Sequence, residues 1–157
     1  MRALLTEDFT LGLEAVDAQH KRVLDCIRAI DEVIDQPGPD MLERLKSALT
    51  ALMDCIEEHF AYEEALLEKA GYPMLEVHKK THDLFRRRLN RYLRRCEAGE
   101  AVAKELLDTL EHWLNNHLRH DDADYVKYLQ KPDQPPPAAE PREAESGGGG
   151  RWRLFGR

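Results

Sequence analysis

The sequence has no long hydrophobic run. No stretch approaches the roughly 18 consecutive apolar residues that a membrane-spanning helix requires. The amino-terminal segment "MRALLTEDFTLG" carries Glu7 and Asp8 where a secretion signal would have its apolar stretch. We therefore expect a cytoplasmic protein that does not bind membranes.

The sequence also has fewer basic than acidic residues. The formal net charge is -7, and residues 1–130 carry 18 basic against 26 acidic residues. Residues 131–157 differ, with five basic and four acidic residues. An acidic domain without a basic stripe repels phosphate backbones, so nucleic acid is not expected as a ligand.

Cysteine is rare. The three cysteines, Cys26, Cys55 and Cys96, are odd in number and far apart in the sequence, a pattern that does not suggest a disulfide framework. As free thiols, they are expected to serve as small apolar residues of the core.

The sequence does contain clear helix-breaking stretches between amphipathic segments. The breakers "QPGPD" at 36–40, "GYP" at 71–73 and "AGE" at 98–100 divide the chain before Lys131 into four segments. Each segment has apolar residues at spacings of three and four, which is typical of a helix that packs one face on its neighbours. Short connections between long helices favour antiparallel neighbours, so the sequence predicts an all-α protein with an up-down-up-down antiparallel four-helix bundle.

The predicted bundle domain spans residues 1–130 and includes an N-terminal arm. A Pro/Gly-rich linker over 131–150 and a basic-aromatic terminal peptide over 151–157 form a C-terminal tail that we expect to be disordered.

Histidine interrupts the predicted core-facing stripe of every helix. In chain order the stripes are Val16, His20, Val23, Ile27, Ile30 and Ile34; Leu42, Leu45, Leu49, Leu52, Ile56, His59, Glu63 and Leu66; Leu75, His78, His82, Phe85, Leu89, Tyr92 and Cys96; and Leu106, Leu110, Trp113, His117 and His120. An unpaired polar side chain buried at such a position costs a few kcal/mol. These polar residues therefore need partners.

Residue counts from the predicted turns place these polar residues at one level of the bundle. For example, His20 lies 18 residues before Gly38 and His59 lies 21 residues after it. Mismatches of one to three residues amount to only about 1.5 to 4.5 Å of helical rise. The six residues that converge on this layer are His20, His59, Glu63, His78, His82 and His117.

Asp122 is a conditional seventh member of the layer. It follows His117 by five residues, which on an ideal α-helix would turn it away by about 140°. It can join only if the helix loosens there, and the sequence "DDAD" is a plausible place for that.

Five histidines and two carboxylates are too many ligands for one tetrahedral zinc ion. Two metal ions fit better, because two bridging carboxylates and a bridging hydroxide would complete one ion and leave the other with an open position. An exogenous ligand would bind at that open position. Imidazole suits iron, zinc, copper and nickel, so the residues alone leave the element open.

The set H, H-x-x-x-E, H-x-x-x-H and H-x-x-x-x-D resembles the hemerythrin family, particularly the bacterial hemerythrins. The contexts "VDAQHK", "EHFAYEEALLEKAGYP" and "HWLNNHLRHDD" are also similar to that family, and the resemblance covers about residues 5–130. It implies two iron ions in a non-haem di-iron centre with a bridging hydroxide or oxo group. It further implies reversible O2 binding, for oxygen storage, delivery or sensing.

The resemblance also implies roles for individual residues. His78, His82 and His117 would hold the coordinatively saturated iron, His20 and His59 would hold the open one, and Glu63 and Asp122 would bridge. Four apolar residues resemble the wall of the family's O2 pocket: Val23, Phe60, Trp113 and Leu114. An apolar wall admits O2 and hinders water and protons.

Three residues do not fit the family pattern. Leu5 stands where the family often has a tryptophan near the pocket. His112 and His120 match no motif position, and we expect His120 to be exposed to solvent.

An enzyme is the alternative reading of the same site, either a di-iron oxidase or an enzyme that processes peroxide or NO. Bundle enzymes of the carboxylate type surround their metals with four carboxylates. This sequence offers two carboxylates and five histidines, and fewer anionic donors favour binding over oxygen activation. The sequence therefore favours an O2-binding protein that is not an enzyme.

The terminal peptide carries an apolar cluster, Trp152, Leu154 and Phe155, between arginines. Its Trp-x-x-Phe spacing is similar to the C-terminal tether by which chemoreceptors recruit their modifying enzymes. A short peptide behind a Pro/Gly spacer also looks like the cargo-loading tails of encapsulin nanocompartments. Residues 151–157 are therefore expected to bind a protein partner, either of the chemotaxis type or an encapsulin shell, and the alternative is a free end without a partner.

Overall fold

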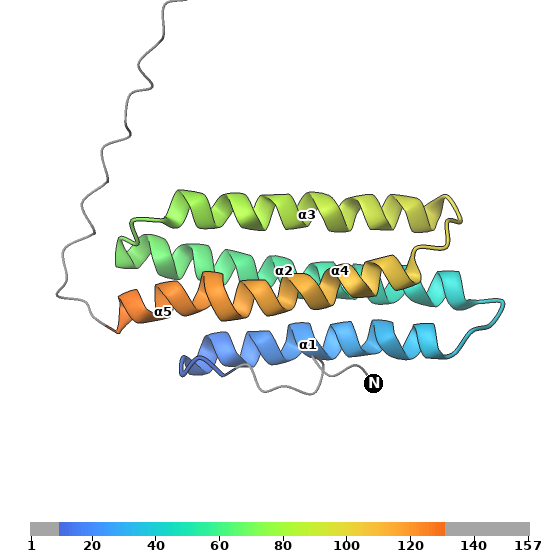
Figure 1. The fold of residues 1–157 in the computed structure, drawn as a ribbon, viewed down its shortest axis with the longest axis horizontal. Coiled ribbons are helices and arrows are strands. Elements are labelled where there is room, and N and C mark those ends of the chain that lie inside the picture. The colour runs from blue at the N-terminus through green and yellow to red at the C-terminus, as the bar shows by residue number, and fades with distance from the viewer. Residues whose placement is uncertain (1–9, 131–157) are drawn as a thin grey trace, which may run out of the picture.

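In a computed structural model, which describes residues 10–130, the chain forms a bundle of long helices. The first three are α1 (Glu14–Asp35), α2 (Met41–Ala70) and α3 (Leu75–Glu97). The fourth runs on through three parts, α4 (Ala103–Asn116), the π-helix η2 (His117–Asp122) and α5 (Ala123–Leu129). Figure 1 shows the four helices side by side and alternating in direction, which confirms the predicted all-α, antiparallel four-helix bundle.

The predicted breakers coincide with the observed helix ends. After α2, Gly71 adopts a left-handed φ of 66°, and the N–H of Tyr72 donates to the carbonyl of Leu67 at 3.0 Å. After α3, Gly99 repeats this arrangement with a φ of 79°. A glycine in this conformation lets the last carbonyls of a helix find partners without steric strain.

Most of the buried apolar side chains among the described residues form one main core cluster. It contains most of the expected apolar stripe residues of all four helices, including Val23, and also Leu114; Val23 and Leu114 are each 1% exposed. A second, smaller cluster of Leu67, Tyr125 and Val126 lies around the α2–α3 turn and α5. The expected end of the α2 stripe at Leu66 was wrong by one position, because Leu67 is buried and Leu66 is only partly so.

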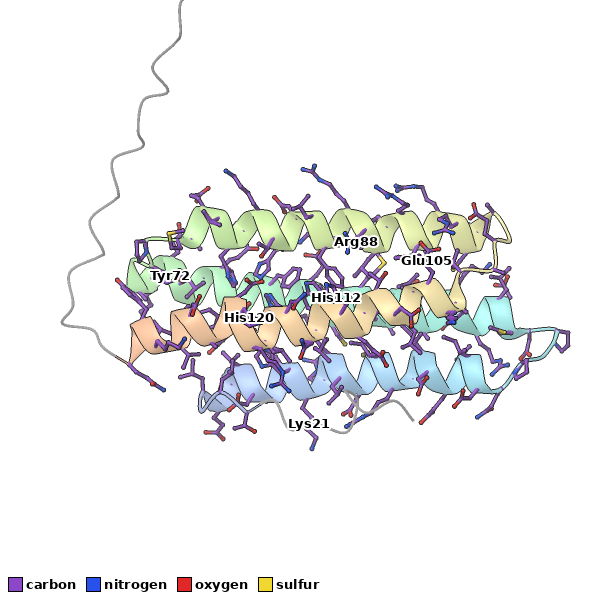
Figure 2. The ribbon with its side chains drawn as sticks, viewed as in Figure 1. Lys21, Tyr72, Arg88, Glu105, His112 and His120 are labelled. Carbon is purple, nitrogen blue, oxygen red and sulfur yellow. The ribbon has the colours of Figure 1, made fainter. Side chains whose placement is uncertain are left out.

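The stripe predicted for the fourth helix fails after His117. His120, which continued the stripe, is exposed, as was expected for that residue from the family pattern, whereas Tyr125 and Val126, which the stripe lacked, are buried. Asp122, the conditional seventh member of the layer, is also buried. A spacing of three or four residues cannot follow the chain through η2, because a π-helix repeats after five. His112 and His120, both labelled in Figure 2, are exposed and do not belong to the buried layer.

The cysteines carry no disulfide, but their burial differs from the expected role as core residues. Cys96 is buried, whereas Cys26 and Cys55 are only partly buried at the edge of the main core. Residues 10–130 include no helix that is both long and apolar enough to cross a membrane. Leu5, the linker and the terminal peptide lie outside the described residues.

Candidate metal centre

Seven polar side chains are buried between the two apolar clusters. They come from all four helices, and none is more than 5% exposed. The set is His20, His59, Glu63, His78, His82, His117 and Asp122. The layer that was counted from the turns is therefore present, and it includes the conditional seventh residue.

The histidines turn the same ring atom inward. Nε2 of His78 and Nε2 of His82 each lie 3.4 Å from Oε2 of Glu63. Nε2 of His59 and Nε2 of His117 lie 3.5 Å from the same oxygen. On the remaining side, Nε2 of His20 lies 3.0 Å from Oδ2 of Asp122.

These side chains fall into two overlapping groups that could each hold a metal ion. Glu63, His78, His82 and His117 form one group, and His20, His59, Glu63 and Asp122 form the other. In each group the potential ligand atoms lie within 4.8 Å of one another. Glu63 is the one residue that belongs to both groups.

Unsatisfied polar atoms show that the residues fit metal ions. Within residues 10–130, Nε2 of His20, His59, His82 and His117 and both oxygens of Asp122 are buried without a hydrogen-bond partner. The 3.0 Å approach of His20 to Asp122 does not complete a hydrogen bond of acceptable geometry. Buried polar groups are rarely left unpaired in native proteins. Imidazole nitrogens and carboxylate oxygens are also the donors that iron and zinc accept.

The π-helix η2 brings Asp122 into the site. It spans His117–Asp122, the one place where the sequence required the helix to loosen. Oδ1 of Asp122 consequently lies 3.3 Å from Nε2 of His117, while its Oδ2 faces His20. The two oxygens of Asp122 thus point to different histidines, one from each group.

A surrounding set of polar side chains, which sequence reasoning missed, orients the histidines. Glu64 Oε1 lies 2.9 Å from Nδ1 of His82, and Gln19 Oε1 lies 3.2 Å from Nδ1 of His59. Asp121 Oδ2 lies 3.5 Å from Nδ1 of His117, an ion-pair distance that does not complete a hydrogen bond. A partner on Nδ1 fixes the ring and leaves Nε2 to face the centre. In the sequence, these partners could be recognised only by position, because each one is next to a candidate metal ligand.

Tyr125 is a further residue that sequence reasoning missed. It is fully buried, and its hydroxyl donates a hydrogen bond to Oε1 of Glu63. Burial, together with the nearby charges of Glu63 and Asp122, raises the pKa of Tyr125 above its usual value. The tyrosine therefore remains a neutral donor to the carboxylate.

Burial and mutual charge set the protonation of the cluster in the absence of metal. Burial lowers the pKa of His59 to about 3. Burial would also lower the pKa of His117, but the charges of Asp122, Asp121 and Glu63 outweigh it and raise the value to about 10. Burial would raise the pKa of Glu63, yet the imidazoles around it hold that pKa well below its usual range. Glu63 is thus an anion and His59 a neutral imidazole, the forms that bind metal.

Two aromatic residues form an apolar wall against the histidines. Phe60, fully buried, stacks on His82 with ring centroids 3.6 Å apart and also contacts His59 and His117. Trp113 stacks on His117 at 4.7 Å. Arg86 covers the Phe60 ring, with its guanidinium carbon 5.0 Å from the ring centroid.

Comparison with known proteins agrees with this geometry. The model of the Hemerythrin HHE cation binding domain matches residues 11–129. A bacteriohemerythrin of Pseudomonas paraeruginosa is 41% identical over 120 residues, which cover 76% of each chain. A bacteriohemerythrin of Stenotrophomonas maltophilia is 34% identical and covers 79% of each chain.

The similarity extends to a myohemerythrin. The myohemerythrin of Theromyzon tessulatum is 28% identical over 119 residues, covering 76% of this chain and 87% of that protein. The matched residues contain the whole buried histidine and carboxylate layer. With its four-helix bundle and its cluster of potential metal ligands, the chain belongs to the hemerythrin family.

Proposed function

We propose that the protein binds O2 reversibly at a non-haem di-iron centre. The observation that carries the proposal is the pair of ligand groups that share Glu63, with five imidazoles and only two carboxylates around one buried centre. Its relatives' names, bacteriohemerythrin and myohemerythrin, support the same activity.

The two groups differ in the number of histidines, and this difference defines the proposed binding side. His78, His82 and His117 would hold one iron, and His20 and His59 would hold the other, with Glu63 and Asp122 bridging. A pair of ferrous ions supplies the electrons that O2 needs to bind. Because the second group has one histidine fewer, its ion would keep an open position for an exogenous ligand.

The surrounding side chains would restrict what else reaches that position. Phe60 lies against His59, His82 and His117. Val23 and Leu114 are buried in the main core cluster, three residues from His20 and from His117, respectively. With Trp113, these four residues are the proposed apolar wall. The wall would admit O2 and exclude water, which slows the irreversible loss of the bound ligand.

The test is an absorption spectrum followed through cycles of deoxygenation and reoxygenation. The full-length protein is loaded with ferrous iron without air, metal content is measured, and O2 is added and then removed under vacuum. We expect two irons per chain and a coloured oxygenated species that disappears and returns over several cycles. One metal per chain, or zinc in preference to iron when the protein is isolated from cells, would contradict the di-iron assignment.

The same experiment separates a binder from an enzyme. A di-iron oxidase or a peroxide- or NO-processing enzyme would consume O2, peroxide or NO continuously in the presence of a reductant. Stopped-flow mixing of the reduced protein with O2 distinguishes the two. A long-lived oxygenated species supports binding, and rapid irreversible oxidation with turnover supports the enzyme.

A further inference from the structure

We propose that Cys26 and Cys55 form a peroxide-sensitive dithiol that closes reversibly to a disulfide between α1 and α2. The two sulfur atoms lie 3.1 Å apart across the interface between these helices. A disulfide bond is about 2.05 Å long, so closure requires the sulfur atoms to approach by only about 1 Å. Both residues are partly buried, so a small oxidant can reach them from solvent.

The surroundings of the pair distinguish the two sulfur atoms. The Arg22 guanidinium forms an ion pair with Glu58 at 2.7 Å. Glu58 and the neighbouring Cys55 sulfur both raise the pKa of Arg22, which places a positive charge beside Cys55. Burial and the hydrogen bond with Cys55 raise the pKa of Cys26 to about 12. Arg22 also acts to lower the pKa of Cys26, but burial and the contact with Cys55 outweigh it. Because the thiolate is the nucleophile, Cys26 is the less favourable attacking sulfur, and we assign that role to Cys55.

The proposed chemistry uses hydrogen peroxide as the oxidant and balances as follows. The Cys55 thiolate attacks one oxygen of the peroxide, the O–O bond breaks, and hydroxide leaves and takes a proton to become water. Cys55 is now a sulfenic acid. The Cys26 sulfur attacks the Cys55 sulfur, the S–O bond breaks, and the hydroxyl leaves as water with the Cys26 proton. Two thiols and one peroxide thus give one disulfide and two water molecules.

The position of the pair gives the disulfide a structural role. Cys55 lies four residues before His59 on α2, and Cys26 lies six residues after His20 on α1. These offsets correspond to about 6 and 9 Å along the bundle axis. The disulfide would therefore tie together the two helices that carry His20 and His59, one to two turns from the centre. The inference does not depend on iron, because it uses added peroxide and two thiols outside the ligand set.

The test follows all three thiols of the full-length protein. Reduced protein, freed of reductant, is treated with increasing hydrogen peroxide and, in parallel, with oxidised glutathione. Digestion without reductant and mass spectrometry then identify the linked peptides. We expect an intramolecular link between Cys26 and Cys55 with loss of two hydrogen atoms, reversal by dithiothreitol, and a higher Tm of the oxidised form. Buried Cys96 is the internal control and should react at least about tenfold more slowly.

Two matched variants test the order of the steps. In Cys26→Ser, peroxide should leave Cys55 as a sulfenic acid that dimedone traps, and no link should form. In Cys55→Ser, Cys26 should take up no dimedone at the same peroxide dose. The proposal is overturned if Cys26 and Cys55 are lost no faster than Cys96, or if they link only between separate chains. Dimedone labelling of Cys26 in Cys55→Ser would overturn the assignment of Cys55 as the attacking sulfur.

Discussion

The hydroxyl of Tyr125, on α5, donates a hydrogen bond to Oε1 of Glu63, on α2, across the centre of the bundle. The other carboxylate oxygen of Glu63 faces four imidazoles. The tyrosine therefore contacts one oxygen of the Glu63 carboxylate, and the histidines surround the other. Loss of a residue that orients a metal ligand in this way typically lowers metal affinity by about 10- to 100-fold.

Replacing this tyrosine should loosen the metal without unfolding the bundle. Tyr125→Phe keeps the buried ring and removes the hydroxyl, and we expect iron to pass to a chelator about tenfold faster. The control is Tyr128→Phe, which removes a hydroxyl that bonds the carbonyl of Gly71 at 3.2 Å. Equal rates of iron release from the two variants would contradict the proposed role of Tyr125.

Glu63→Ala should be more harmful to the centre than His20→Ala. Glu63 belongs to both potential ligand groups, whereas His20 belongs to one. We expect the glutamate variant to lose both irons and the histidine variant to keep at least one, as measured by metal analysis after anaerobic loading. Two irons and an unchanged O2 spectrum in Glu63→Ala would refute the bridging role.

Glu64 should matter through His82. Glu64→Ala removes the oxygen that lies 2.9 Å from Nδ1 of His82, and we expect iron affinity to fall about 10- to 100-fold. Arg86 also donates to Glu64 Oε1 at 3.3 Å. Glu57→Ala is the matched control, because exposed Glu57 accepts from the same arginine at 3.0 Å but contacts no histidine of the layer. A similar loss of affinity in both variants would assign the effect to Arg86 and not to His82.

Metal binding should release a proton from His117. In the metal-free protein its pKa is about 10, so the imidazole is protonated at neutral pH and must lose its proton when a metal binds. The affinity should therefore rise with pH between about 6.5 and 8.5, by about tenfold per unit from this group alone. His59, with a pKa of about 3, adds no dependence in that range. Proton release on metal addition in weakly buffered solution measures the effect, and its absence would contradict the raised pKa.

The bundle should not need the tail. The last helix ends with the N–H of Gln130 bonded to the carbonyl of Val126 at 3.0 Å, and truncation after Gln130 removes none of the described contacts. We expect O2 binding and Tm to stay unchanged. We also expect the truncated protein to lose co-purification with a partner or shell that residues 151–157 recruit from native cells. Altered O2 affinity, or identical co-purifying proteins with and without the tail, would count against this role.

Sequence periodicity was sufficient for the first three helices and for most of the buried layer. Three breakers and spacings of three and four residues gave the helices, and counting from Gly38 and Gly71 brought His20, His59 and His78 to one level. The method works because an α-helix has a constant rise and each connection is short.

The same periodicity failed where the backbone stops being α-helical. Extending the spacing past His117 selected His120, which is exposed, and missed Tyr125, which is fully buried. The histidine partners Gln19 and Glu64 could not be predicted from the sequence for another reason. They lie beside the buried stripe, and their bonds to histidine Nδ1 depend on side-chain geometry that no spacing rule encodes.

The π-helix η2 behaves as a one-residue insertion in a helix whose buried positions would otherwise repeat every seven residues. Upstream, Leu110 and His117 are seven apart; downstream, Asp122, Tyr125 and Leu129 each fall one position later than that repeat predicts. The π-helix takes up this extra residue, so the side chains of α5 keep the buried face of α4. A deletion at exposed His120 would restore the regular repeat and return Asp122 to the same face of a straight α-helix. An equal deletion in α4 or α5 would instead turn all later side chains by about 100°. We therefore expect related chains to vary the length of this helix at η2 and not within α4 or α5.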